Sequence, residues 1–406
     1  MSWINFQESV AQRQGRINLD DQQTATKNIK LNAHALVRGV AGSGKSLLLR
    51  ERVERLRQNG FRNILVLCYN RFMKGWLKKE VDIGSTFHSW AYPNLGYTYN
   101  WDEDPDERKR VIELARKFGK RKKYEAILVD EAQDFYDEWF QSLLEIIDPN
   151  TNSIFFVYDN TQSVYGKAHR TKKNWAWKNL GLDIVPARSQ VFDINYRNSP
   201  EILEVAWKYI QPTLKQADLP VGQVTFNNGR RAPAPYMLVE PRSKSSRSSG
   251  IEPLLIDVSS KDVASTVAEE VNLALNGHSE SSIGILTHPN NKGLRQDIHE
   301  ELKNLGIEHH APTHSRERDF SVVYRPCVIV DSWNAVKGVE FDAVIIVGAD
   351  WVKDYADLDK DFEEKAGLYV AMTRARDHLV ILYERKTDTV EWLQEVLESE
   401  SVLRNA

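Results

Sequence analysis

The sequence predicts an α/β fold of two units, each a parallel sheet flanked by helices. Short, β-branched apolar runs recur along the chain, which is typical of strands buried on both faces. They lie at 35–37, 64–67, 127–129 and 154–157, and again at 283–286, 328–330, 344–347 and 379–382. Stretches with helical periodicity, such as 45–58 and 261–275, separate them. We expect one unit over residues 1–199 and a second over 200–406.

Composition and charge narrow the class of protein. The 406 residues suffice for two or three domains, and 41% hydrophobic with 27% charged residues is ordinary for a soluble globular chain. A net charge of -3 does not by itself indicate a nucleic-acid partner, whose binding would need a local basic groove. Two cysteines imply no disulfide framework. With no secretory signal at 1–10 and no bilayer-spanning apolar run, we expect a cytoplasmic protein without a membrane partner.

A glycine-rich loop predicts a phosphate site. The motif G-x-x-x-x-G-K-[ST] is matched in full by Gly39, Val40, Ala41, Gly42, Ser43, Gly44, Lys45 and Ser46. It follows a strand-like run and opens a helix-like run, a context that disfavours a chance glycine turn. Backbone N–H groups and the helix N-terminus would surround the phosphates. Lys45 would reach the β- and γ-phosphates, and the Ser46 hydroxyl would hold Mg²⁺.

An acidic pair completes the predicted site. The run Ile-Leu-Val at 127–129 ends in Asp130 and Glu131, so both carboxylates follow a buried strand. The carboxyl ends of parallel strands form the edge where ligands bind. We expect Asp130 to hold Mg²⁺ and Glu131 to activate or position the attacking water. A simple helix cap is the alternative.

These residues carry a resemblance. The sequence Asp-Glu-Ala-Gln-Asp at 130–134 resembles motif II of the UvrD/Rep/PcrA group of superfamily 1 helicases, and other motifs of that group follow in order. They are the Q motif at 19–23 (Leu-Asp-Asp-Gln-Gln), motif Ia at 68–71 (Cys-Tyr-Asn-Arg), Ib at 85–89 (Ser-Thr-Phe-His-Ser), III at 159–165 (Asp-Asn-Thr-Gln-Ser-Val-Tyr), IV at 195–198 (Asn-Tyr-Arg-Asn), V at 337–342 (Lys-Gly-Val-Glu-Phe-Asp) and VI at 369–376 (Tyr-Val-Ala-Met-Thr-Arg-Ala-Arg). The resemblance spans residues 19 to about 385 and implies two RecA-like lobes that hydrolyse ATP.

The resemblance also assigns roles to single residues. It implies that Gln23 reads the adenine edge, Tyr196 stacks on the base, Gln162 senses the γ-phosphate, Arg197 touches the γ-phosphate, Arg374 is the arginine finger, and Glu340 belongs to the cofactor-binding set. Arginines near the γ-phosphate stabilise the charge of the transition state. The alternative for Arg374 is a surface ion pair. Because Arg197 and Arg374 lie far from the glycine loop in sequence, a site shared by two lobes would let ATP draw them together.

A single-stranded DNA track needs aromatic platforms and phosphate donors. The candidates are Asn70, His88, Tyr165, Trp177 and Trp333, although an aromatic residue alone is more often part of the core. Three positions depart from the family on this side. They are Cys68 in place of a phenylalanine, Lys167 in place of an aromatic residue, and Asn334 in place of a histidine. Trp175 or Trp177 is the candidate to replace the lost platform, and the departures disfavour vigorous unwinding.

The chain also lacks room for the inserted domains of full UvrD-like helicases. Residues 89–125 accommodate a helix or two, and 197–336 reads as part of the second lobe. The basic stretch 107–123 is either a solvated helix face or a contact for phosphates or a partner. We therefore expect a compact translocase on single-stranded DNA. The alternative is an ATP-switched subunit triggered by nucleic acid or by a protein partner such as a nuclease, by analogy with bacterial antiviral defence systems.

Overall fold

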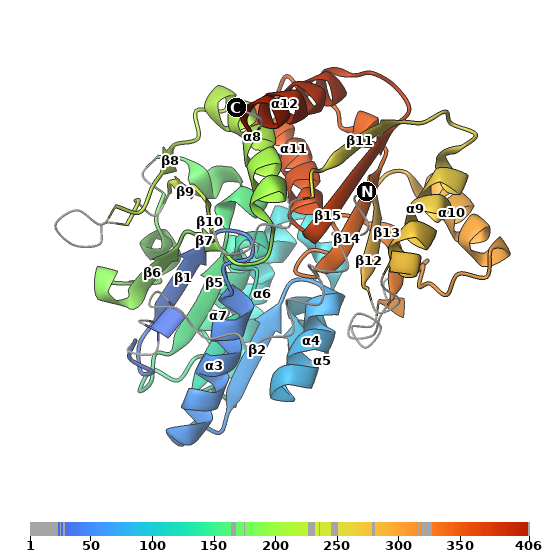
Figure 1. The fold of residues 1–406 in the computed structure, drawn as a ribbon. Coiled ribbons are helices and arrows are strands. Elements are labelled where there is room, and N and C mark those ends of the chain that lie inside the picture. The colour runs from blue at the N-terminus through green and yellow to red at the C-terminus, as the bar shows by residue number, and fades with distance from the viewer. Residues whose placement is uncertain are drawn as a thin grey trace. The chain divides into compact units, whose positions relative to one another are not determined.

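The computed structural model describes residues 23–24, 26, 29–163, 168–173, 175–225, 232–234, 236–244, 251–277, 281–314, 317–318 and 327–404. These residues form two compact units. Of the described residues, those within Asn18–Asp193 and Pro220–Glu240 form the N-terminal unit, and those within Ile194–Leu219 and Pro241–Ala406 form the C-terminal unit. Figure 1 shows the elements of both.

The N-terminal unit is built on a six-stranded parallel sheet with the order β3-β2-β4-β5-β1-β6. Its strands are β1 (Ala35–Gly39), β2 (Ile64–Cys68), β3 (Ser85–Thr86), β4 (Ala126–Val129), β5 (Ile154–Tyr158) and β6 (Ser189–Phe192). Its helices are α3 (Lys45–Gln58), α4 (Arg71–Val81), α5 (Phe87–Leu95), α6 (Pro105–Gly119) and α7 (Asp137–Leu144). Apolar residues of α3 and α4 pack on one face of the sheet, and those of α5, α6 and α7 pack on the other. Burial on both faces explains the continuous apolar runs.

The C-terminal unit repeats this plan with a five-stranded parallel sheet of order β11-β15-β14-β12-β13. Its strands are β11 (Leu254–Asp257), β12 (Ile283–Thr287), β13 (Val328–Ser332), β14 (Phe341–Val347) and β15 (Ala375–Tyr383). Its helices are α8 (Pro200–Gln216), α9 (Val263–Gly277), α10 (Lys292–Asn304), α11 (Leu358–Met372) and α12 (Asp388–Arg404). Helices α9 and α10 cover one face, while α8 packs against α11, α12 and β15. The predicted fold class, parallel sheets flanked by helices, is confirmed.

The chain passes between the two units more often than a single boundary after residue 199 implies. Among the described residues, the C-terminal unit begins at Ile194, because β7 (Ile194–Asn195) pairs with β10 (Arg242–Ser243) of that unit. The segment Pro220–Glu240 then belongs to the N-terminal unit. It holds two short paired strands, β8 (Val221–Gly222) and β9 (Leu238–Val239). We call Pro220–Glu240 the returning segment.

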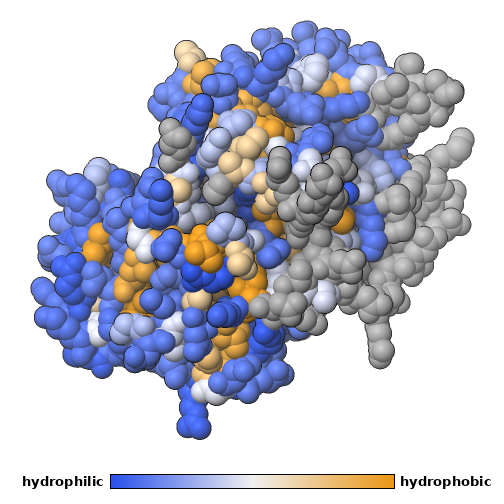
Figure 2. Space-filling model, turned by 90° about the vertical axis from the view of Figure 1, so that its left-hand side faces the viewer, coloured by the Kyte–Doolittle hydropathy of each residue, from blue (hydrophilic) through white to orange (hydrophobic). Residues whose placement is uncertain are grey.

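Among the residues that the structure describes, no helix has the length and apolar character needed to cross a membrane. On the face shown in Figure 2, apolar residues lie in small groups among hydrophilic ones.

A buried histidine next to β1 predicts acid sensitivity. His34 is 8% exposed, and its Nδ1 accepts a hydrogen bond from the Ile154 N–H at 3.2 Å. Burial, together with the charge of Arg188, lowers the pKa of His34 from 6.5 to about 4. The folded state therefore favours the neutral ring, so this stability is present above pH 6.5 and is lost as the pH falls toward 4. We expect the free energy of unfolding to fall by ~1–2 kcal/mol between pH 7 and pH 5 from this group.

Denaturant titrations at several pH values check this expectation. His34→Asn keeps an acceptor near the same position but does not titrate, so it should have a flatter pH profile than the wild type. Equal slopes for the two proteins would contradict the assignment.

Candidate nucleotide site

The glycine loop joins β1 to α3 at the carboxyl edge of the sheet, as the motif predicts. Gly42 and Gly44 have φ of 64° and 82°, in the left-handed region where a side chain is strained. A Cβ on Gly44 would lie 2.5 Å from Nε2 of Gln23. Both glycines are therefore required for the path of this loop.

Lys45, the first residue of α3, turns its amino group back into the loop. Its Nζ donates to the carbonyl oxygens of Gly39 and Val40, both at 2.9 Å, and lies 4.0 Å from Oδ2 of Asp159. This places a cation inside the curve of backbone that would receive a phosphate.

Ser46 and Asp130, far apart in sequence, meet at the same place. Asp130 directly follows β4, and its Oδ2 accepts a 2.8 Å hydrogen bond from the Ser46 hydroxyl. Burial raises the pKa of Asp130, and the neighbouring Glu131 carboxylate raises it further. An oxygen-rich, buried acidic pair beside a hydroxyl is the donor set that suits Mg²⁺, and a bound cation would offset this repulsion. The residues thus fit the ion that the sequence predicts.

A chain of hydrogen bonds leads from Glu131 to Gln162. Gln133 Nε2 donates to Glu131 Oε2, and the Gln133 Oε1 accepts from the Asp159 N–H at 3.0 Å. Asp159 Oδ2 then accepts from Gln162 Nε2 at 2.6 Å. Glu131 itself has a φ of 51°, an uncommon backbone conformation for a non-glycine residue, which aims its side chain at this network. Sequence reasoning gave Gln133 no role, although it lies within motif II.

Gln23 lies against the same loop. It is buried, and its Nε2 donates to the Ser43 carbonyl oxygen at 3.0 Å. Its contact with adenine stays a prediction.

The residues assigned to the nucleotide from motifs IV to VI form a second cluster, in the C-terminal unit. Arg197 Nε donates to Glu340 Oε2 at 2.6 Å, and Arg376 pairs with the other oxygen of Glu340. Although burial alone would raise it, Arg376 and Arg197 hold the pKa of Glu340 well below its usual range. Tyr196 lies beside them with Lys244 Nζ 4.9 Å from its ring centre. Glu340 thus pairs with both Arg197 and Arg376, and its place in the cofactor-binding set stays a prediction.

Arg374 is buried rather than at the surface. Its Nε donates to the Val370 carbonyl at 3.0 Å and its Nη2 to the Thr373 hydroxyl at 3.1 Å. It is 1% exposed, so the alternative of a surface ion pair does not hold. These bonds hold the end of α11 in place around the predicted finger.

Two family models match the chain in the order that the motifs predict. Residues 22–168 match an AAA domain, and residues 313–386 match a UvrD-like helicase C-terminal domain. This chain belongs to the UvrD-like superfamily 1 helicases. It is therefore a nucleotide-hydrolysing, helicase-type motor protein with two RecA-like lobes.

Two solved structures are similar to this helicase at low identity. The C-terminal domain of a possible DNA helicase from Lactobacillus plantarum WCFS1 has 15% identity and a TM-score of 0.30, over 50% of this chain and 96% of that one. Arterivirus nonstructural protein 10 (helicase) in complex with DNA has 10% identity and a TM-score of 0.37, over 92% of this chain and 65% of that one. A search of curated proteins found no match.

The aromatic platforms predicted for the helicase fare less well. Trp177 is 4% exposed and packs among Phe140, Phe156 and Tyr158, so the prediction that it offers a platform to a base is wrong. Trp333 is 2% exposed, and a Cβ on Gly367 would lie 2.8 Å from its indole nitrogen. The prediction that Trp333 offers a platform to a base is therefore wrong as well. Both rings serve the core of their own unit.

The remaining nucleic-acid candidates either bond to residues near them in sequence or lie outside the described residues. Asn70 caps α4, accepting from the Met73 N–H at 2.8 Å. His88 is half-buried, with Nε2 2.6 Å from Asp102 Oδ2. Tyr165 and Lys167 lie outside the described residues.

A buried arginine that the sequence reasoning passed over holds the segment after motif II. Arg170 is 1% exposed and donates to the carbonyl oxygens of Ala132 and Phe135 and to the carboxylate of Asp137. Its guanidinium also lies over the ring of Trp177, 5.2 Å from the ring centre. Arg170 thereby fixes the turn that follows Glu131.

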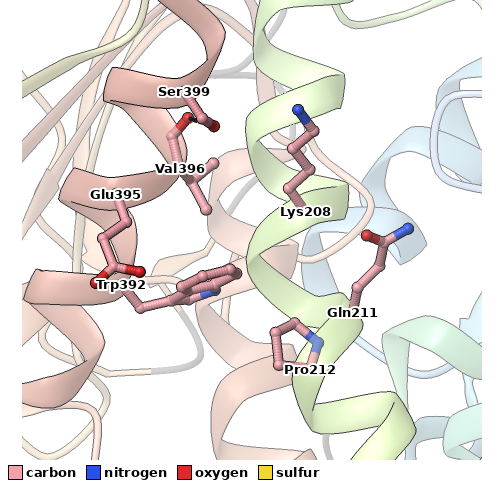
Figure 3. A pocket seen from close by; sticks show the side chains of 7 residues that line it. All are labelled: Lys208, Gln211, Pro212, Trp392, Glu395, Val396 and Ser399. Atoms are coloured by element: carbon pink, nitrogen blue, oxygen red, sulfur yellow. Dashed lines mark hydrogen bonds between the residues drawn. The ribbon is translucent and has the colours of Figure 1, made fainter.

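The helicase also has a hollow of about 380 Å³ between α8 and α12 of the C-terminal unit. Figure 3 shows Trp392 and Val396 facing Lys208 and Pro212 across it. None of the predicted site residues lines this hollow.

Proposed function

We propose that this helicase is an ATP-driven translocase on single-stranded DNA. The observation that carries the proposal is the Ser46–Asp130 hydrogen bond beside the network from Glu131 to Gln162, all around one phosphate loop. Bound Mg²⁺ would neutralise charge on the phosphates there. Ser46 and Asp130 are the residues to hold it.

The predicted catalytic residues of the N-terminal unit each have a defined task in this proposal. Lys45 exchanges its bonds to the loop carbonyls for bonds to phosphate oxygens. Glu131, kept in place by Gln133, orients the attacking water and takes its proton. Gln162 reports through Asp159 and Gln133 on the γ-phosphate to the same carboxylate.

The C-terminal unit supplies positive charge in the proposed cycle. Arg197 and Arg374 stabilise the transition state when the two lobes close on ATP, and hydrolysis releases the lobes again. Repeated closing and opening on a bound strand produces movement, 3′ to 5′ by analogy with the family. We also propose a compact form, because the described elements between α5 and β4 are only a 3₁₀ turn at Tyr99–Glu103 and α6.

The test is ATP hydrolysis with and without single-stranded DNA or RNA, with Lys45→Ala as the blank. We expect single-stranded DNA to raise kcat by ~10-fold or more, because strand binding favours the closed, hydrolysing state. Displacement of a protein block from a DNA end measures movement. If neither nucleic acid changes the rate, the translocase proposal fails.

The burial of Trp177 and Trp333 favours a second candidate, an ATP-switched subunit without sustained movement. With both rings buried, the protein lacks two of the predicted base platforms that a translocating strand would use. This candidate predicts stimulated hydrolysis without displacement of the block. A protein trigger, such as a nuclease partner, is to be sought if hydrolysis responds to no nucleic acid.

A further inference from the structure

A charged residue lies inside the central sheet of the N-terminal unit. All five residues of β1 are buried between β5 and β6, and Arg38 within it is 3% exposed. It directly precedes Gly39, the first residue of the phosphate loop. Burying a guanidinium is costly unless its N–H groups are bonded, so its partners matter.

Within the described part of the chain, backbone carbonyls of the returning segment accept hydrogen bonds from Arg38. Nη1 donates to Ala234 at 2.7 Å and to Met237 at 2.8 Å, and Nη2 donates to Pro233 at 2.7 Å. A planar guanidinium can bond several carbonyls at once in fixed directions, which an ammonium cannot. Arg38 therefore fixes this stretch of backbone to the strand that leads into the loop.

Apolar packing joins the same two parts. Val224 and Val239 of the returning segment form a buried cluster with Val40 of the phosphate loop and Val191 of β6. Strand β9 also contacts the 3₁₀ turn Asn160–Gln162, which carries Gln162. The returning segment thus contacts two parts of the nucleotide site.

Both ends of the returning segment continue into the C-terminal unit. Helix α8 precedes it, and β10 follows it and pairs with β7. Tyr196 and Arg197 directly follow β7, and the Lys244 N–H donates to the Asn195 carbonyl at 3.3 Å. A short covalent path with a strand pairing therefore runs from the contacts of Arg38 to Tyr196 and Arg197.

We propose that Arg38 is a positioning residue for hydrolysis. By holding the returning segment on β1, it restrains the chain that leads into β10 and, through the pairing of β10 with β7, the backbone that carries Arg197. This inference rests on the proposed function, because it needs Arg197 to act on the nucleotide.

The test is a double-mutant cycle of Arg38→Met and Arg197→Ala, read as kcat and KM for ATP. We expect Arg38→Met to lower kcat ~10-fold with KM changed less than ~3-fold, because a contact made in the transition state is lost. In the Arg197→Ala background it should lower kcat less than ~2-fold, because both changes remove one effect.

Arg52→Met is the matched control. Arg52 is also 3% exposed in the same unit and donates to the carbonyls of Ile29 at 2.9 Å and Lys30 at 2.6 Å. It should lower the melting temperature as Arg38→Met does while changing kcat less than ~2-fold and additively. A kcat loss in Arg52→Met as large as in Arg38→Met would overturn the inference, since loss of stability alone would then explain both.

The other outcomes distinguish a failure of the proposed role of Arg197 from a failure of the inference about Arg38. If Arg197→Ala leaves kcat unchanged, the proposed role of Arg197 fails and this inference fails with it. If Arg197→Ala slows hydrolysis and the losses simply multiply, only the inference is overturned. Should Arg38→Met not fold, Val224→Ala replaces it in the cycle, with an expected ~3-fold loss of kcat that also vanishes with Arg197→Ala. A loss that persists in that background overturns the inference.

Discussion

Glu131→Gln should lower kcat for ATP hydrolysis by ~10³-fold and leave the Kd for ATP within a few-fold, since general base catalysis typically contributes ~10²–10⁴. The side chain keeps its length, and its amide oxygen can still accept from Gln133. The loop, Lys45 and the Ser46–Asp130 pair are not altered. What is lost is the carboxylate that we propose takes a proton from the attacking water.

Single-turnover hydrolysis measured beside binding of a fluorescent ATP analogue separates these effects. Glu145→Gln is the matched control, because Glu145 is a carboxylate of the same unit, pairs with Arg116 at 2.9 Å and lies outside the site. The control should keep both hydrolysis and binding. Unchanged turnover in Glu131→Gln would remove this residue from its assigned role.

The sheets could be predicted because parallel strands buried on both faces need apolar side chains at every position. The runs 127–129 and 344–347 lie within β4 and β14 for this reason. The meeting of Ser46 with Asp130 was predictable too. Each residue follows the carboxyl end of a strand of the same parallel sheet, the edge where ligands bind in such sheets, so the two were expected to lie close together.

Other parts had no local signal in the sequence. The strands of the returning segment are two residues long, which is too short for any periodicity. Arg38 interrupts an apolar run, and only the tertiary structure brings the carbonyls of Pro233, Ala234 and Met237 to it. Trp177 and Trp333 are of the residue type that stacks on bases, but the type alone does not tell a tryptophan of the core from one on the surface.

The arrangement of Arg374 leads to the second large effect that we expect. Arg374→Ala should lower kcat by ~10³-fold, because an arginine finger is worth 10³–10⁵ in phosphoryl transfer. The same change removes the bonds to Val370 and Thr373, so a loss of stability accompanies it. Arg374→Lys keeps the positive charge but cannot form the planar fork, and it should recover only part of kcat.

Stability and catalysis have to be read separately to establish the finger. Hydrolysis is measured well below the melting temperature of each variant, with the folded fraction determined by circular dichroism. Arg385→Ala, which removes an exposed arginine paired with Asp350 at 3.0 Å in the same unit, controls for the change in charge and should keep kcat within ~2-fold. If the kcat of Arg374→Ala falls only in proportion to its folded fraction, the bonds to Val370 and Thr373 are the whole function of this arginine. A loss far beyond that fraction, with ATP binding retained, requires its guanidinium in the transition state.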